Sequence, residues 1–365
     1  MKILLIMMLL FLCYPAAQAE EDAARAAESI DYSAWQEYAD SQGMTLDVKE
    51  MVLSLVGLGG WDIPGALQAV SDAAREELND AAMLVGMLAA PVLLCALIGQ
   101  FASQREHTLE WMGVLIVSAF LLAEFCTAYE TARKTLDAMK RLVETVFPLL
   151  TALFAAAGGT GSAAMLTPAA AIVSGVITSV ASGMGLGLCS CAAGIASACE
   201  ISSRIRLSKL FELLKNVCNR MMITLIGLFL GILKVQELLG GTYDSAMVKT
   251  ARYAADTLIP VVGGEVAGTV DMIVGSAKLV KNASGVTGIV MLAVLCLRPV
   301  LKIAVPLIAC RVTSAMLEPV STGKLGGMLE RFGDVMTMLL AVVISSMVLG
   351  MLLLGATLAH GSSVI

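Results

Sequence analysis

The chain has 365 residues, of which 58% are hydrophobic and only 15% charged, and its formal net charge is -6. Soluble domains carry about 25% charged and about 45–50% apolar residues, so this composition predicts an all-α, polytopic helical membrane protein. Residues 20–80 hold 14 acidic and 3 basic side chains, whereas the rest of the chain is mildly basic. An acidic head on such a body excludes nucleic acid as a partner, because phosphate binding requires clustered Lys and Arg.

The N-terminus has the organisation of a signal peptide. Lys2 precedes an apolar run at 3–13, and Ala17-Gln18-Ala19 provides a cleavage motif before Glu20. So short a run does not cross about 30 Å of hydrocarbon, which favours cleavage between Ala19 and Glu20 over retention as an anchor. We therefore divide the chain into a signal peptide (1–19), an acidic extracytoplasmic helical region (20–80) and a multi-pass transmembrane domain (81–365). The acidic region has few large apolar residues, and we expect it to lie on the membrane body or on a partner.

Hydropathy predicts about seven transmembrane helices, within a range of six to eight. The strongest apolar segments are 81–99, 111–129, 286–309 and 335–359. Residues 130–146 are charged and amphipathic, so either this stretch lies on the membrane interface or one neighbouring apolar segment is re-entrant. Residues 163–198 are too many for one span and are interrupted by glycines, so they could form two.

No motif in the chain predicts an enzyme. The glycine-rich segment at 158–162 lacks the lysine of a nucleotide-binding loop. Cys189, Cys191 and Cys199 are close in sequence, but both histidines are distant and no set of zinc ligands forms, so we interpret these cysteines as buried apolar side chains. We expect no metal and no cofactor, and any energy source must come from a partner or an ion gradient.

Small and polar residues recur along one helical face between 264 and 285. They are Gly264, Gly268, Asp271, Gly275, Lys278, Asn282 and Gly285, at spacings of 4, 3, 4, 3, 4 and 3. This stripe has two interpretations. Small residues let helices approach closely, which predicts a packing seam. Ionisable groups at membrane depth instead predict the lining of a wet cavity or path.

Three further charges interrupt apolar segments. Arg298 and Lys302 lie four residues apart beside Pro299, so they share one face. Their depth favours a functional role, although contact with lipid headgroups at a broken helix is an equal alternative. Glu124 comes late in the second span, and we expect it to snorkel to the surface.

With these residues in view, the chain resembles the stage III sporulation protein AE family of endospore-forming bacteria. The resemblance rests on EISSRIRL at 200–207, FLGILK at 229–234, DTLIPVVG at 256–263 and LVKNASG at 279–285. It is continuous from about 195 to 330, whereas residues 20–130 are only generically similar to the family. The ordered PVVG and KN pieces are more specific than any single motif above.

The resemblance implies a permease-like integral component of the channel that joins mother cell and forespore, placed in the mother-cell membrane that surrounds the forespore. It also implies partners: the other products of the stage III sporulation A operon, including a cytosolic ATPase and ring-forming proteins, and the forespore protein Q. Two alternatives remain open from the residues themselves. One is a self-sufficient ion-coupled transporter, and the other is a membrane scaffold that conducts nothing.

Overall fold

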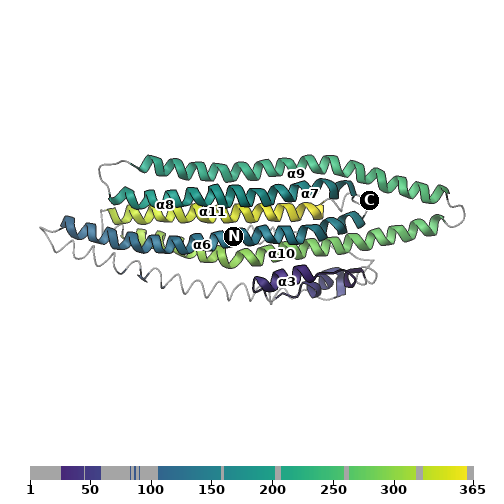
Figure 1. Ribbon diagram of the computed structural model, residues 1–365, viewed down its shortest axis with the longest axis horizontal. Helices are drawn as coiled ribbons and strands as arrows, with labels where there is room; N and C mark the ends of the chain where they lie inside the picture. Colours follow the sequence, from purple (N-terminus) through teal and green to yellow (C-terminus); the bar gives the residue numbers. More distant parts are fainter. Residues whose placement is uncertain are drawn as a thin grey trace.

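The computed structural model describes residues 26–44, 46–58, 106–157, 160–201, 207–258, 263–317 and 324–359, together with positions 83, 86, 87 and 90. The long helices lie side by side in one elongated bundle (Figure 1). Its five rods are α6 (Glu106–Ala156), α7 (Thr160–Val176) continued through η2 (Ile177–Gly185) and α8 (Leu186–Ile201), α9 (Ser208–Leu258), α10 (Gly263–Leu317) and α11 (Lys324–Ala359). In this described part of the chain, each rod contains a stretch long and apolar enough to cross a bilayer. The predicted all-α membrane fold is confirmed.

Two of the predicted N-terminal features fall on other parts of the chain. The signal peptide at 1–19 lies outside the described residues, and so does most of the span predicted at 81–99. The total of about seven spans therefore stays a prediction, of which five candidates are seen among the described residues.

Helix α6 is continuous where the sequence predicted separate pieces. It runs from Glu106 to Ala156 through the charged stretch at 130–146 and past Pro148. Its buried residues recur at intervals of three or four: Val114, Val117, Leu121, Phe125, Ala128, Ala132, Leu136, Met139, Val143, Val146 and Leu150. Because this apolar face continues beneath the charges, the charged stretch packs on the same neighbours as the segments that flank it. The expected separation of 130–146 from its neighbours is not observed.

The segment predicted as two possible spans forms one rod. Helices α7 and α8 are joined by the π-helical turns of η2, so the glycines at 183, 185 and 187 do not break it. A π-helical stretch accommodates extra residues without ending a helix. A Cβ at Gly185 would lie 3.0 Å from Met222 Cε and 3.1 Å from Val342 Cγ2. The glycine therefore permits close approach of α9 and α11.

Helices α9 and α10 are longer than a bilayer is thick. They contain 51 and 55 residues, or about 77 and about 83 Å at 1.5 Å per residue, against about 30 Å of hydrocarbon. The end of α9 and the beginning of α10 project together beyond the ends of α7 and α11 (Figure 1). Since the spans in these helices cover 208–235 and 275–316, the projecting hairpin extends beyond the apolar part of the bundle.

Helix α11 forms the centre of the bundle and packs against α6, α8, α9 and α10. Its inward positions are buried along nearly its whole length, and include Met328, Phe332, Val335, Leu339, Val342, Ser346, Leu349 and Leu353. In lipid, helices associate through close packing rather than through the hydrophobic effect. A central helix buried on several sides supplies that packing for its neighbours.

The N-terminal helices α3 (Ser33–Ser41) and α4 (Val48–Leu53) pack on the membrane body, against α6 and α10. The Tyr38 hydroxyl donates to the Ala138 carbonyl at 2.7 Å, and the Tyr32 hydroxyl hydrogen-bonds with Ser284 Oγ at 3.2 Å. Trp35 is only 1% exposed. Burial raises the pKa of both phenols, so both stay protonated at neutral pH. Of the two positions that the sequence left open for this region, body or partner, the described residues occupy the first.

An ion cluster joins three rods at the opposite end of the bundle from the α9–α10 hairpin. Asp334 of α11 accepts from Lys215 of α9 at 2.8 Å and from Arg311 of α10 at 2.6 Å. A Cβ at Gly333 would lie 3.2 Å from Arg311 Nε, so this glycine gives the guanidinium its place. Asp334 is only 17% exposed, and two charged donors satisfy one carboxylate there.

We predict that Asp334→Asn destabilises the bundle. It removes the charge that both cations share while keeping the side-chain shape, and we expect a loss of about 1–3 kcal/mol in the free energy of unfolding. Thermal unfolding in detergent measures the change. Glu130→Gln is the control, because its ion pair with Lys134 is 4.0 Å long and highly exposed, and such pairs are worth about 0.2–0.5 kcal/mol. Equal losses in the two variants would contradict a structural role for the cluster.

Candidate functional site: the polar half of α10

The stripe predicted at 264–285 lies on one continuous helix, because α10 is helical from Gly263 onward. The surroundings of Gly264, Gly268 and Asp271 lie outside the described part. Among the remaining positions, Lys278 is half-buried and Asn282 is exposed. A Cβ at Gly275 would meet nothing within 4 Å. The described stripe therefore follows the edge of the buried face of α10 and not its centre.

Gly285 is the stripe residue that makes a close helix contact. A Cβ there would lie 2.7 Å from Leu358 Cδ2 and 3.4 Å from the Thr357 hydroxyl of α11. One turn farther along α10, a Cβ at Gly288 would lie 3.2 Å from Val146 Cγ1 of α6 and 3.5 Å from Leu354 Cδ2 of α11. Packing thus accounts for the end of the stripe, and the wet-path interpretation of its other members remains a prediction.

The structure identifies a residue that the stripe analysis missed. Lys281 is 1% exposed, and its Nζ has no hydrogen-bond partner. The ammonium lies over the ring of Phe154 of α6, 4.4 Å from the ring centroid, which is cation–π geometry. Burying an ionisable group without a hydrogen-bond partner is costly, and such a group marks a functional site more often than a stabilising one.

A second periodic line in the sequence contains Lys281. Ala277, Lys281, Ser284 and Gly288 follow at spacings of 4, 3 and 4, and the last three are buried. Three of the four are small, which lets a long side chain between them lie flat against α6. This line was readable beside the first, but nothing in its spacing distinguishes a buried lysine from an exposed one.

The N-terminal helices contact α10 beside this lysine. Ser284, which is fully buried, hydrogen-bonds with the Tyr32 hydroxyl. Because Ser284 lies three positions after Lys281 on α10, Tyr32 contacts this helix within one turn of the buried lysine. The described part of the acidic region therefore packs on α10 within one turn of its buried charge.

The remaining predicted charges do not join Lys281. Arg298 and Lys302 are both exposed on α10, which runs unbroken through Pro299 and Pro306. The broken helix that one of the two interpretations of these charges required is not observed, since α10 accommodates both prolines on its way to Leu317. Glu124 on α6 is half-buried, and it lies near the other end of the bundle, at the level of Cys310.

Gly285→Leu should weaken the packing of α10 on α11. The larger side chain has no room beside Leu358, and overpacking of this kind costs about 1–3 kcal/mol. Gly275→Leu is the matched control on the same stripe, because that position is open. Thermal unfolding in detergent compares the two variants. The same melting temperature in both would show that the Gly285 contact is not a packing constraint.

Comparison with known proteins identifies the family. The family model described as stage III sporulation protein AE matches residues 46–361, which include all five rods. The stage III sporulation protein AE of Bacillus subtilis (strain 168) is 23% identical over 221 residues, or 60% of this chain and 55% of that protein. The similarity thus spans about half the length of this relative. No solved structure matches the chain. The protein belongs to the stage III sporulation protein AE family.

Proposed function

We propose that this chain is the permease-like membrane subunit of a channel between mother cell and forespore, in the mother-cell membrane that surrounds the forespore. The family match over 46–361 is the observation that carries this proposal. A role in sporulation follows from the family, and the conducting role is our inference from the polar and charged groups of the bundle.

The bundle differs from a simple anchor in what it buries. A helical membrane anchor needs only apolar helices. In this bundle Lys281 is fully buried between α6 and α10, and its ammonium has no hydrogen-bond partner. Such groups are retained in membrane proteins where ions, protons or solutes pass. This burial favours a conducting subunit over the scaffold that conducts nothing.

The proposed partners supply what this chain lacks. Its sequence carries no nucleotide-binding loop, so a cytosolic ATPase encoded in the same stage III sporulation A operon is the proposed energy source. The ring-forming proteins of that operon and the forespore protein Q are the proposed continuation of the path across the gap between the two membranes.

A clean deletion of the gene in its own host tests the sporulation role. We expect engulfed forespores to arrest and heat-resistant spores to be lost, with recovery when the full chain is supplied in trans. Normal forespore development in the deletion strain would overturn the proposal.

Lys281→Met tests the conducting role separately. Removing a buried charge that has a cation–π contact but no hydrogen bond should change thermal stability little, but we expect spore formation to fall by at least an order of magnitude. Lys209→Met is the control, because Lys209 is exposed at the start of α9. Normal spore numbers with a stable Lys281→Met protein would show that the buried ammonium has no role in transport.

A further inference from the structure

One flank of the bundle is charged at a position along the bundle axis where another flank is apolar. The charged flank is the outward side of α6, defined here as the α6 polar stripe: Thr127, Glu130, Arg133, Lys134, Asp137, Lys140, Arg141 and Glu144, all exposed or half-buried. From first to last the stripe is about 26 Å long at 1.5 Å per residue, close to the thickness of the hydrocarbon core.

The close contacts at glycines show which residues of neighbouring helices lie at the same height along the bundle axis. A Cβ at Gly185 would touch both Met222 and Val342, and one at Gly288 would touch both Val146 and Leu354. Val342 and Leu354 are twelve residues apart on α11, or about 18 Å along its axis. We call the layer of the bundle between these two heights the slab.

Helices α6, α9 and α11 run in the same direction, so the slab can be read on each of them. On α9, the pairs Lys215–Asp334 and Met222–Val342 advance together along α11. Helix α10 runs opposite to α6, since Gly288 meets Val146 whereas Lys281 meets Phe154. It also runs opposite to α11, since Gly285 meets Leu358 whereas Leu292 meets Gly350. Counting twelve residues from Met222 on α9 and back from Val146 on α6, the slab holds residues 222–234 of α9 and 134–146 of α6.

Within this slab the two helices present opposite chemistry. Residues 222–233 of α9 contain no charge, and the exposed Lys234 stands at the end of the slab. The outward side chains between them include Ile223 at 70% and Leu228 at 60% exposure. Residues 134–146 of α6 present Lys134, Asp137, Lys140, Arg141 and Glu144. Helix α11 packs between α9 and α6, which lie on its opposite sides (Figure 1).

The N-terminal helices extend the charged flank. Tyr38 holds them to Ala138, which lies inside the slab. Their outward residues are mainly acidic and include Glu37, Asp40, Asp47 and Glu50, all exposed. An outward surface of this composition needs water, at the height at which α9 needs lipid.

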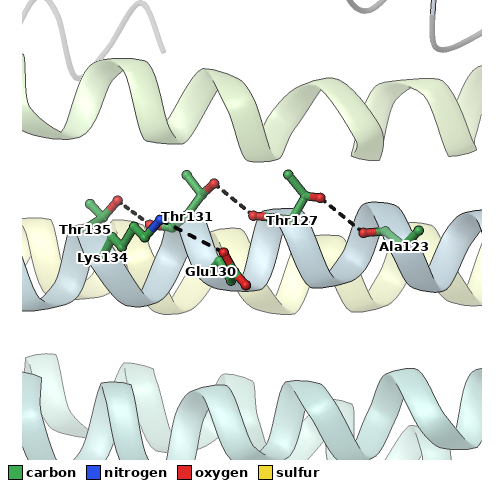
Figure 2. Close-up of polar contacts among 6 residues, drawn as sticks. All are labelled: Ala123, Thr127, Glu130, Thr131, Lys134 and Thr135. Atoms are coloured by element: carbon green, nitrogen blue, oxygen red, sulfur yellow. Dashed lines mark hydrogen bonds and ion pairs between the residues drawn. The ribbon is translucent and has the colours of Figure 1, made fainter.

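The charges of the stripe neutralise one another. Glu130 pairs with Lys134 at 4.0 Å and Lys140 with Glu144 at 3.8 Å. Beside them, Thr127, Thr131 and Thr135 donate to the carbonyls four residues earlier, so their hydroxyls are satisfied within the helix (Figure 2). Four basic and three acidic side chains leave the stripe itself with a net charge of +1. The exposed carboxylates of the N-terminal helices beside it make the flank as a whole acidic, which suits a hydrated wall that favours cations.

We propose that the α6 polar stripe lines a water-filled path through the membrane, closed by further copies of this chain. In such an assembly, α6 faces the axis and the apolar side of α9 faces lipid. Copies around an axis place identical residues at equal heights, but each acidic residue of the stripe lies within one turn of a Lys or Arg, so the long basic side chains of one copy reach the carboxylates of the next. The path would pass small hydrophilic solutes, with a preference for cations. This inference rests on the proposed channel function and names the surface that carries it.

Single-cysteine labelling at matched heights tests the wet path. Asp137→Cys and Arg141→Cys on the stripe are compared with Ile223→Cys and Leu228→Cys on α9, in the full chain with its native cysteines replaced, in membranes of the sporulating host. A charged maleimide reacts only with a hydrated thiolate, so we expect labelling about tenfold or more faster at the stripe positions. A lipid-soluble maleimide should label the α9 positions.

Two outcomes would overturn the wet path. Equal labelling of both helices by the charged reagent would place the slab outside the bilayer, and protection of the stripe would make it dry. Neither outcome touches the sporulation role, which the deletion strain tests on its own.

Cross-linking tests closure by further copies. A bifunctional thiol reagent should join two copies through Asp137→Cys and fail to do so through Leu228→Cys. If the charged maleimide labels Asp137→Cys in one sample and the cross-linker yields only monomers of the same variant in another, closure by further copies of this chain is overturned.

Discussion

The hydrocarbon core of a bilayer does not solvate ions, and a charge placed at its centre costs about 2.5–3.5 kcal/mol even by the more lenient insertion scales. The bundle meets this constraint by separating its surfaces around α11. On one side, α9 exposes aliphatic side chains such as Ile223 and Leu228. On the other, α6 and the N-terminal helices expose charges at the same height. Both surfaces are satisfied only if lipid lies on one side of the bundle and water on the other.

The close packing of α11 with its neighbours makes this separation possible. Glycines at 185, 285, 288 and 350 bring helices together where a Cβ would meet a neighbour. The Lys215–Arg311–Asp334 cluster then ties α9, α10 and α11 at one end, and the N-terminal helices are held on α6 and α10 by Tyr38 and Tyr32. A rigid bundle of this kind keeps its charged and apolar flanks in fixed register.

Much of this architecture could be predicted from the sequence, and the failures have physical causes. Apolar composition and segment lengths predicted an all-α membrane protein. Treating the charges at 130–146 as the dominant signal hid the continuity of α6, because the buried residues from Val114 to Leu150 form an apolar face beneath them. Proline at 299 suggested a broken helix, yet α10 continues to Leu317.

The functional residues were harder to predict, because burial depends on which rods become neighbours. The spacing of glycines and charges at 264–285 predicted one functional face of α10. The fully buried ammonium belongs instead to Lys281, the residue before Asn282 of that face. No local pattern indicates that Phe154 of α6 will lie beneath that ammonium. Likewise, the charges of α6 indicate a hydrated surface only because residues 222–234 of α9, which are mostly apolar, lie at the same height.

An electron cryo-microscopy map of the protein, purified with its partners in a lipid nanodisc, shows most directly whether α6 faces water at the height at which α9 faces lipid. We expect several copies around an axis, with the α6 polar stripe turned toward a hydrated lumen and α9 in contact with the lipid belt. A map with the stripe of α6 in the lipid belt, or with α9 facing the lumen, would contradict this arrangement.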